Sequence, residues 1–292
     1  MQANQRGDKS MNHTMILSWV TFIYFASFVL YLFRLISGKE FWGRAASFLA
    51  WVGLAAQTIA LLLRWKNSYD LGMGHVPLAN LYESMIFFAW AIILIYLIIE
   101  WRTKSKIIGA FVVPMAFLAM AYASISPDIN NRIAPLIPAL QSNWLTSHVV
   151  TCFMGYAAFA IAFGCGLIYL LKNMEKGDVE KPAGFLGRLP ALATLDTLIY
   201  QSTALGFVFL TIGIMTGSIW AHYAWGSYWS WDPKETWSLI TWLIYAIMLH
   251  SRFVRGWRGK RMAILALIGF ACVLFTYLGV NYLPGMHSYL QA

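Results

Sequence analysis

Charged residues are scarce in this sequence, and long hydrophobic stretches take their place. Asp, Glu, Lys and Arg together make up 11% of the 292 residues, hydrophobic residues make up 60%, and the mean hydropathy is +0.61. Soluble domains usually contain about 25% charged residues, so a soluble domain of ordinary composition is excluded. We predict an all-α integral membrane protein whose surroundings are a lipid bilayer.

Cysteine is also rare. The chain has three cysteines, Cys152, Cys165 and Cys272, and none of them belongs to a CxxC pair. This excludes a disulfide framework and a zinc-knuckle site. All three lie in apolar stretches, so they are predicted to be small core residues.

Eight apolar runs are long enough to cross a hydrocarbon core of roughly 30 Å. We predict eight transmembrane helices, preceded by a polar N-terminal tail at residues 1–13, with residues 14–292 forming a single polytopic domain. The first run lacks a small-residue cleavage site, so it is predicted to be a retained span and not a signal peptide. The predicted spans are residues 14–36, 45–63, 81–100, 107–125, 145–171, 198–220, 234–251 and 262–283.

Lysine and arginine are distributed unevenly between the two sides of these spans. Of the 21 basic residues, 15 fall in the four loops that follow the odd-numbered spans. The positive-inside rule places these loops in the cytoplasm and both termini on the outer side. The net charge of +9 is therefore attributed to contact with acidic lipid headgroups, and no nucleic-acid binding is expected.

Tryptophan is concentrated in one place. Six of the fourteen tryptophans lie in the 23 residues from Trp220 to Trp242, on the side predicted to face outward. Anchoring in an interfacial aromatic belt explains the outer members of this group. It does not explain the crowding around Gly226 of Trp225, Tyr228, Trp229 and Trp231. The crowding predicts a binding surface for a large, flat, partly apolar molecule.

Two helix starts are predicted from capping patterns. Asp232 is followed by Pro233 and by Glu235 three positions later, as in an N-cap, first position and capping box. Asn80 and Glu83 repeat the spacing at the start of the third span. Capping therefore explains Asp232 without a ligand, and Glu83 is expected also to position the preceding loop.

Histidines supply candidate metal ligands. His148 lies at the outer start of the fifth span and His287 just after the eighth, both at the level of the tryptophan-rich loop. Two imidazoles that flank an aromatic shelf predict a bis-histidine site for haem. His75 and His222 are interpreted as non-ligands.

His250 lies at a different depth. It follows Pro233 by 17 residues, which places it about 25 Å further along the helix, near the cytoplasmic edge. An ionisable residue there is a functional candidate, and the neighbouring Arg252 and Arg255 are predicted to meet haem propionates. None of the other five histidines lies at that depth, so a second iron ligand is expected from another chain.

The stretch from Trp225 to Trp237, WGSYWSWDPKETW, resembles the WGxxWxWDPKETW pattern of the CcsA/ResC family, the membrane subunit of the system II cytochrome c synthase. The DPKETW ending and the eight spans resemble this family more than the related CcmC and CcmF proteins. The resemblance covers most of the chain but not the N-terminal tail. It extends to residues 77–84, residues 138–142 with Trp144 and His148, residues 249–252, and His287.

The resemblance implies a mechanism. Haem b would enter a transmembrane site at His250 and move to an external site, where His148 and His287 hold it on the tryptophan motif (residues 220–237). There its vinyl groups would meet the reduced thiols of a CxxCH segment of an apocytochrome c. The residues implied to contact haem are Trp225, Gly226, Tyr228, Trp229, Trp231, Asp232, Trp237 and Arg252.

The resemblance also implies partners and a location. A CcsB/ResB-type membrane protein would supply the other transmembrane histidine, and thiol-reducing thioredoxin-like proteins would keep the cysteines of the apocytochrome reduced. The membrane would be a bacterial plasma membrane or a thylakoid membrane, with the site facing the periplasm or lumen.

Two other functions remain open. One is a haem exporter or chaperone that delivers haem without attaching it. The other is a quinone-linked haem b subunit that transfers electrons. The second would need paired histidines within facing helices, whereas His148 and His287 lie at helix ends.

Overall fold

The computed structural model describes residues 2–127, 129–174 and 185–285, with side chains from His13 onward. Every regular element in this part of the chain is helical. The long helices are α1 (Gln2–Ser37), α2 (Glu40–Asp70), α3 (Leu81–Thr103), α4 (Gly109–Ile125), α5 (Asn143–Asn173), α6 (Leu192–Trp225), α7 (Pro233–Arg255) and α8 (Lys260–Tyr277). Three short 3₁₀ helices are η1 (Pro138–Leu140), η2 (Leu186–Arg188) and η3 (Gly279–Tyr282).

The predicted all-α membrane fold is confirmed. Seven of the described helices are long and apolar enough to cross a membrane. The eighth predicted span corresponds to α4, which has 17 residues and a length of about 25 Å. Because α4 packs beside α1 and α3, its flanks are covered by helices of full length.

Several helix ends differ from the predicted spans. α2 continues to Asp70, beyond the predicted span that ends at residue 63, so the outer loop begins at Leu71. The reason is that its last turns carry polar residues with structural partners: Ser68, for example, accepts a hydrogen bond from the backbone N–H of His75. α6 likewise runs on to Trp225, and α8 ends at Tyr277 before η3. The apolar runs in the sequence identify only the part of each helix that contacts lipid or the protein core, so the polar ends of the helices were not predicted.

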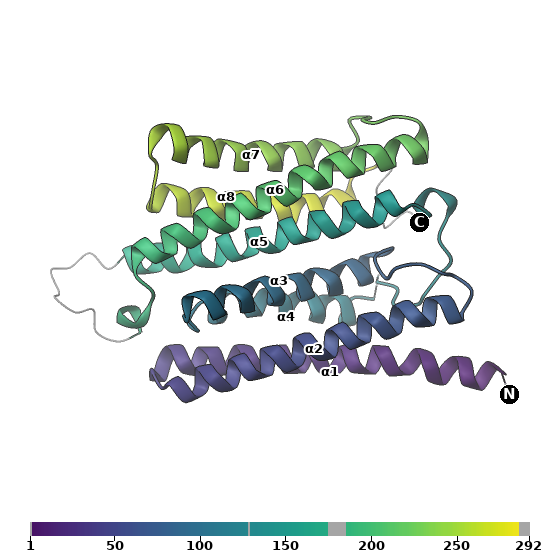
Figure 1. The fold of residues 1–292 in the computed structure, drawn as a ribbon, viewed down its shortest axis with the longest axis horizontal. Coiled ribbons are helices and arrows are strands. Elements are labelled where there is room, and N and C mark those ends of the chain that lie inside the picture. The colour runs from purple at the N-terminus through teal and green to yellow at the C-terminus, as the bar shows by residue number, and fades with distance from the viewer. Residues whose placement is uncertain (1, 128, 175–184, 286–292) are drawn as a thin grey trace.

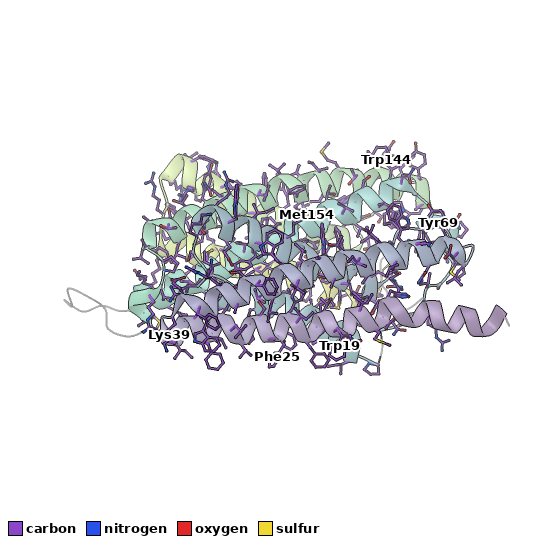
Figure 2. All side chains as sticks on the ribbon, turned by 60° about the horizontal axis from the view of Figure 1, so that its bottom comes forward. Trp19, Phe25, Lys39, Tyr69, Trp144 and Met154 are labelled. Atoms are coloured by element: carbon purple, nitrogen blue, oxygen red, sulfur yellow. The ribbon has the colours of Figure 1, made fainter. Side chains whose placement is uncertain are left out.

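The helices form an elongated bundle (Figure 1). The α1–α2 pair lies along one side and α6 and α7 along the other. α5 lies between them and packs against α3, α4, α6 and α8. Aromatic residues on α1 such as Trp19 and Phe25 point away from the bundle (Figure 2). Large exposed apolar side chains on this surface agree with a lipid environment.

The two ends of the bundle differ in what they carry. α1, α3, α5 and α7 all begin at the same end (Figure 1). That end therefore holds the loop from α2 to α3, the loop from α4 to α5, the end of α6 and the start of α7. Lys39 lies at the opposite end from Tyr69 and Trp144 (Figure 2). We call the end that carries the tryptophan motif the aromatic end; that it faces outward remains a prediction.

Candidate functional site: an aromatic pocket beside His148

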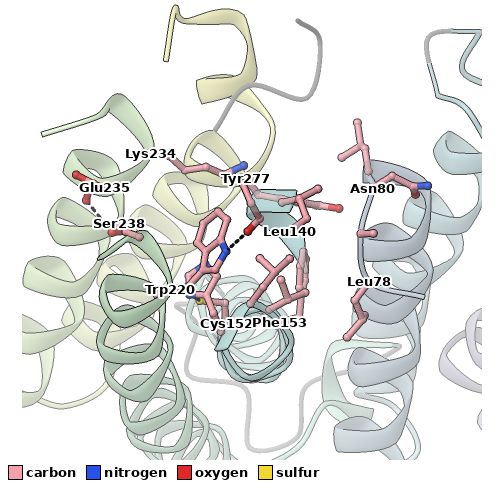
Figure 3. Close-up of a pocket in the computed structure, with 18 of the residues that line it drawn as sticks. Leu78, Asn80, Leu140, Cys152, Phe153, Trp220, Lys234, Glu235, Ser238 and Tyr277 are labelled. Atoms are coloured by element: carbon pink, nitrogen blue, oxygen red, sulfur yellow. Dashed lines mark hydrogen bonds between the residues drawn. The ribbon is translucent and has the colours of Figure 1, made fainter. Parts of the chain in front are cut away.

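A pocket of about 620 Å³ opens at the aromatic end. One wall comes from the start of α3 and the loop before α5, and the other from α6, the start of α7 and the end of α8. α5 runs between them and contributes Cys152 and Phe153 (Figure 3). The pocket therefore lies between the N-terminal and C-terminal helices of the bundle.

His148 lines this pocket from the second turn of α5. Its Nδ1 lies 2.7 Å from the carbonyl oxygen of Gly213 on α6. Because a carbonyl can only accept, Nδ1 carries the hydrogen and Nε2 carries the lone pair. Histidines that bind metals are commonly oriented by such a bond from the other ring nitrogen. This tautomer is the one that ligates a metal through Nε2.

The imidazole of His148 is also held by aromatic packing. Its ring stacks on Trp220, with centroids 6.2 Å apart and an angle of 17° between the planes. The indole N–H of Trp220 donates to the carbonyl oxygen of Ala139 in η1 at 2.8 Å, a contact drawn in Figure 3. Trp225 packs edge-on against Trp220 at 4.8 Å. The loop before α5, α6 and the tryptophan motif are thus joined at one point.

The tryptophan motif consists of the end of α6, a short turn and the start of α7. α6 ends at Trp225, and Gly226 caps it with φ of +80°, a left-handed conformation that glycine adopts without strain. The connecting segment is residues 226–232. Trp231 also has a left-handed φ of +59°, which is uncommon for a bulky residue and costs about 1–3 kcal/mol. The surrounding contacts hold this turn in one shape.

The start of α7 has the predicted cap. Asp232 Oδ1 accepts from the N–H of Lys234 at 2.9 Å, Pro233 occupies the first position, and Glu235 completes a capping box. Glu235 Oε2 also accepts from the N–H of Ser230 at 2.7 Å. The capping prediction is therefore confirmed, and the two carboxylates of this motif hold the turn together.

The structure brings together some of the predicted haem-contacting residues. Trp225, Tyr228 and Trp229 line the pocket with His148. The other predicted members of the motif are Gly226, Trp231, Asp232 and Trp237, and none of these is in the pocket lining. Trp231 is 69% exposed, and Trp237 packs on Phe275 of α8 at 4.2 Å.

His287 lies outside the described residues. The last described residue, Gly285, is packed against the motif, since a Cβ added there would lie 2.6 Å from Oδ2 of Asp232. The chain thus returns to the start of α7 two residues before His287 in the sequence.

His250 and Arg252 lie at the opposite end of α7. His250 is exposed on the surface of the bundle. Arg252 forms a two-pronged pair with Asp196 of α6, at 3.1 and 2.8 Å, and its guanidinium lies over the ring of Tyr200. Asp196 Oδ1 also accepts from the N–H of Gly259 at 2.7 Å. The predicted contact of Arg252 with a propionate stays a prediction, and the arginine has a structural partner in this state.

The two histidines that are predicted not to bind iron, His75 and His222, have other contacts. Both ring nitrogens of His75 lie 3.0 Å from backbone carbonyl oxygens, those of Val76 and Ala134. His222 is exposed and stacks on Tyr228, with centroids 4.2 Å apart. Neither histidine lines the pocket.

Several pocket residues were not predicted. Lys234 and Tyr277 line it, as do Asn80 and Tyr82 of the α3 wall. Lys234 stands inside the tryptophan motif, so its position was a usable signal. The spacing of Cys152 and Tyr156, four and eight residues after His148, also indicated one helix face. The α3 wall had no such spacing signal, although its residues fall in the stretch 77–84 to which the family resemblance extends.

A buried ion pair supports the α3 wall. Arg64 of α2 and Glu83 of α3 are each 1% exposed at the side chain and lie 2.7 Å apart. Glu83 accepts from the N–H of Ala79 at 2.8 Å, and Arg64 donates to the carbonyl oxygen of Asn131 at 2.9 Å. The pair therefore fixes both segments of this wall, which confirms that Glu83 positions the loop.

This arrangement defines a class: a polytopic helical membrane protein with an aromatic, histidine-containing pocket at one end of its bundle. Residues 78–287 match the family described as cytochrome C assembly protein, and all residues that line the pocket fall in that range. The chain is 45% identical over 237 residues to the cytochrome c biogenesis protein CcsA of Chlamydomonas reinhardtii, which covers 79% of this chain and 64% of that protein. It is 39% identical over 274 residues to CcsA of Guillardia theta, 88% of each chain.

The chain therefore belongs to the CcsA family of cytochrome c assembly proteins, as the sequence resemblance predicted. A solved structure of Cytochrome c Heme Lyase CcmF superposes with a TM-score of 0.68 at 19% identity. The superposition covers 92% of this chain and 47% of the CcmF chain, and it shows a shared fold.

Proposed function

We propose that this chain binds haem b in the aromatic pocket and presents it for covalent attachment to the CxxCH thiols of an apocytochrome c, as the membrane subunit of a system II cytochrome c synthase. Membership of the CcsA family supports a role in cytochrome c maturation. The observation that carries the proposal is the position of His148, which joins Trp225, Tyr228 and Trp229 in the lining of one pocket.

The pocket residues fit a haem. The pocket volume of about 620 Å³ lies within the range of roughly 300–1,000 Å³ that ligand sites usually span. Its tryptophan and tyrosine rings offer apolar area to a flat ligand. His148 offers Nε2 as an axial nitrogen, because Nδ1 is bonded to Gly213. His287, two residues after Gly285, is proposed as the second external ligand.

The proposed role of the chain in attachment is orientation. In thioether formation an S–H group adds across a vinyl C=C bond: sulfur bonds to one carbon, the proton goes to the other, and nothing leaves. The reaction then depends on holding the vinyl edge and the thiol in register, and fixed rings with a fixed axial nitrogen provide this. No side chain of this chain is assigned as an acid or base.

The proposed partners follow from the rest of the bundle. His250 is exposed at the end of α7 opposite the pocket, and the other four histidines with described side chains lie toward the aromatic end. A CcsB/ResB-type protein is proposed to pack there and supply the facing ligand of a transmembrane haem site. Thioredoxin-like proteins would keep the apocytochrome thiols reduced on the outer side.

The proposal is tested by the visible spectrum of the detergent-purified protein. We expect a low-spin haem b spectrum for the wild type, a high-spin or weakened one for His148→Ala, and recovery when imidazole is added. His222→Ala is the matched control, because His222 belongs to the same end but not to the pocket, and its spectrum should match the wild type.

Attachment itself needs a second measurement. Co-expression with a CcsB/ResB-type protein and a CxxCH apocytochrome should give covalent haem with the wild type and much less with His148→Ala. Haem binding without attachment under these conditions would favour an exporter or chaperone. A wild type that never binds haem would contradict the proposal.

A further inference from the structure

We infer that Lys234 is the residue that recognises a carboxylate of the ligand, so that the pocket selects a flat ring bearing an acidic group at its edge. This inference rests on the proposed function and identifies the propionate contact of the external site. Lys234 lines the pocket and extends from the first turn of α7 into the space before the α3 wall (Figure 3).

The charges at the pocket favour an anion. Two cationic side chains line it, Lys234 and Arg132, with one carboxylate, Glu235. Glu235 Oε2 accepts from the N–H and hydroxyl of Ser230 and from the N–H of Asp232. These donors belong to the turn and the start of α7, so this carboxylate is directed to the backbone and compensated there.

The neighbouring acid is also used in the cap. Asp232 is buried, and its Oδ1 accepts from the N–H of Lys234. The start of α7 adds a partial positive charge to the same place. An incoming carboxylate would therefore meet the ammonium of Lys234, on which the charge of Asp232 also acts, and the end of a helix dipole. The rest of the pocket lining is mostly aliphatic and aromatic.

Arg252 does not compete for this role. It lies 18 residues after Lys234 in the sequence, about 27 Å along the same helix, and is paired with Asp196. The acidic edge of a ligand in the aromatic pocket would consequently be placed at the start of α7.

The test compares two porphyrins that differ only in charge. Purified protein without haem is titrated with ferric protoporphyrin IX and with its dimethyl ester, and the dissociation constants are read from the Soret band. Lys234→Met should weaken binding of the acid about tenfold to a hundredfold, in line with loss of a charge-assisted hydrogen bond, and leave the ester unchanged. Lys234→Arg should keep most of the preference for the acid.

Lys66→Met is the matched control, because Lys66 is an exposed lysine of α2 near the same end that does not line the pocket. It should bind both porphyrins like the wild type. Equal weakening of acid and ester by Lys234→Met would overturn the inference and make Lys234 a packing residue. A wild type that binds neither porphyrin would instead count against the proposed function.

Discussion

Gly217 of α6 lies directly against the imidazole of His148. A Cβ added at Gly217 would collide with Nδ1 of that ring and lie 2.7 Å from Cε1. One turn earlier on α6, Gly213 supplies the carbonyl oxygen that Nδ1 contacts. α6 thus provides a hydrogen-bond acceptor and the space for the ring on the same face.

Gly217→Ala should therefore displace His148 without unfolding the protein. Alanine is a better helix former than glycine by about 1 kcal/mol, so α6 itself should not be weakened. We expect the low-spin haem spectrum to shift toward high spin and to recover with imidazole. Met215→Ala is the control, because Met215 is an exposed residue of α6 that does not line the pocket. An unaltered spectrum in Gly217→Ala would contradict the assigned geometry.

Two substitutions of Asp232 distinguish the effect of its charge from the effect of its hydrogen bond in the cap. Asp232→Asn keeps an acceptor oxygen for the N–H of Lys234, whereas Asp232→Ala removes it. We expect alanine to lower the free energy of unfolding by about 1 kcal/mol and asparagine to change it little. Thermal unfolding followed by circular dichroism measures both. If asparagine were as damaging as alanine, the carboxylate would have a role beyond the cap.

Removing one partner of the Arg64–Glu83 pair should destabilise the protein strongly, whereas replacing both partners with apolar residues should destabilise it less. Removing one partner of a buried ion pair leaves an uncompensated charge and typically costs about 3–5 kcal/mol. Glu83→Gln should therefore lower the unfolding temperature clearly, while the double variant Arg64→Met with Glu83→Met should recover much of the loss. Hydrogen exchange at residues 76–82 should rise in the double variant, because methionine cannot accept from the N–H of Ala79. The exposed Arg132→Met is the control, which should leave stability unchanged.

Substitutions in the Arg252–Asp196 pair test whether Arg252 has a structural role, a ligand-binding role or both at the other end of the bundle. Asp196→Asn should increase proteolysis in the loop from α7 to α8, because it weakens the bonds to Arg252 and to the N–H of Gly259. Arg252→Lys should act similarly, since lysine cannot reproduce a two-pronged contact. If Arg252 also meets a propionate, its replacement should reduce haem content at the His250 site more than Asp196→Asn does. Equal losses would limit Arg252 to its structural pair.

Much of the fold could be predicted from local patterns. Apolar run lengths located the helices, and the spacing from Asp232 to Glu235 and from Asn80 to Glu83 located two helix starts, because capping depends on residues close in the sequence. The crowding of tryptophans near Gly226 and the level of His148 predicted elements that the structure places in one pocket. These signals are local, or need only the depth of each residue in the membrane.

The remainder depends on contacts between helices. Nothing near Arg252 in the sequence identifies Asp196, 56 residues earlier, as its partner. The same applies to Arg64 and Asn131, and hence to the wall formed by residues 129–140. Helix ends were misplaced for a related reason. A helix can continue through polar residues such as Ser68 when a residue of a later loop forms a hydrogen bond with them. The hydropathy of the sequence gives no information on such bonds.

The position of Arg64 has a consequence for biogenesis. All residues that line the pocket come after position 77, but the arginine that holds its α3 wall belongs to α2. Since membrane proteins are made from the N-terminus, Arg64, which precedes Glu83 by 19 residues, enters the membrane with α2 ahead of α3. An arginine without its carboxylate is costly in lipid, and arrival of α3 removes that cost. The order of synthesis therefore favours immediate docking of α3 on α2, so that one edge of the pocket is fixed before His148 and the tryptophans enter the membrane.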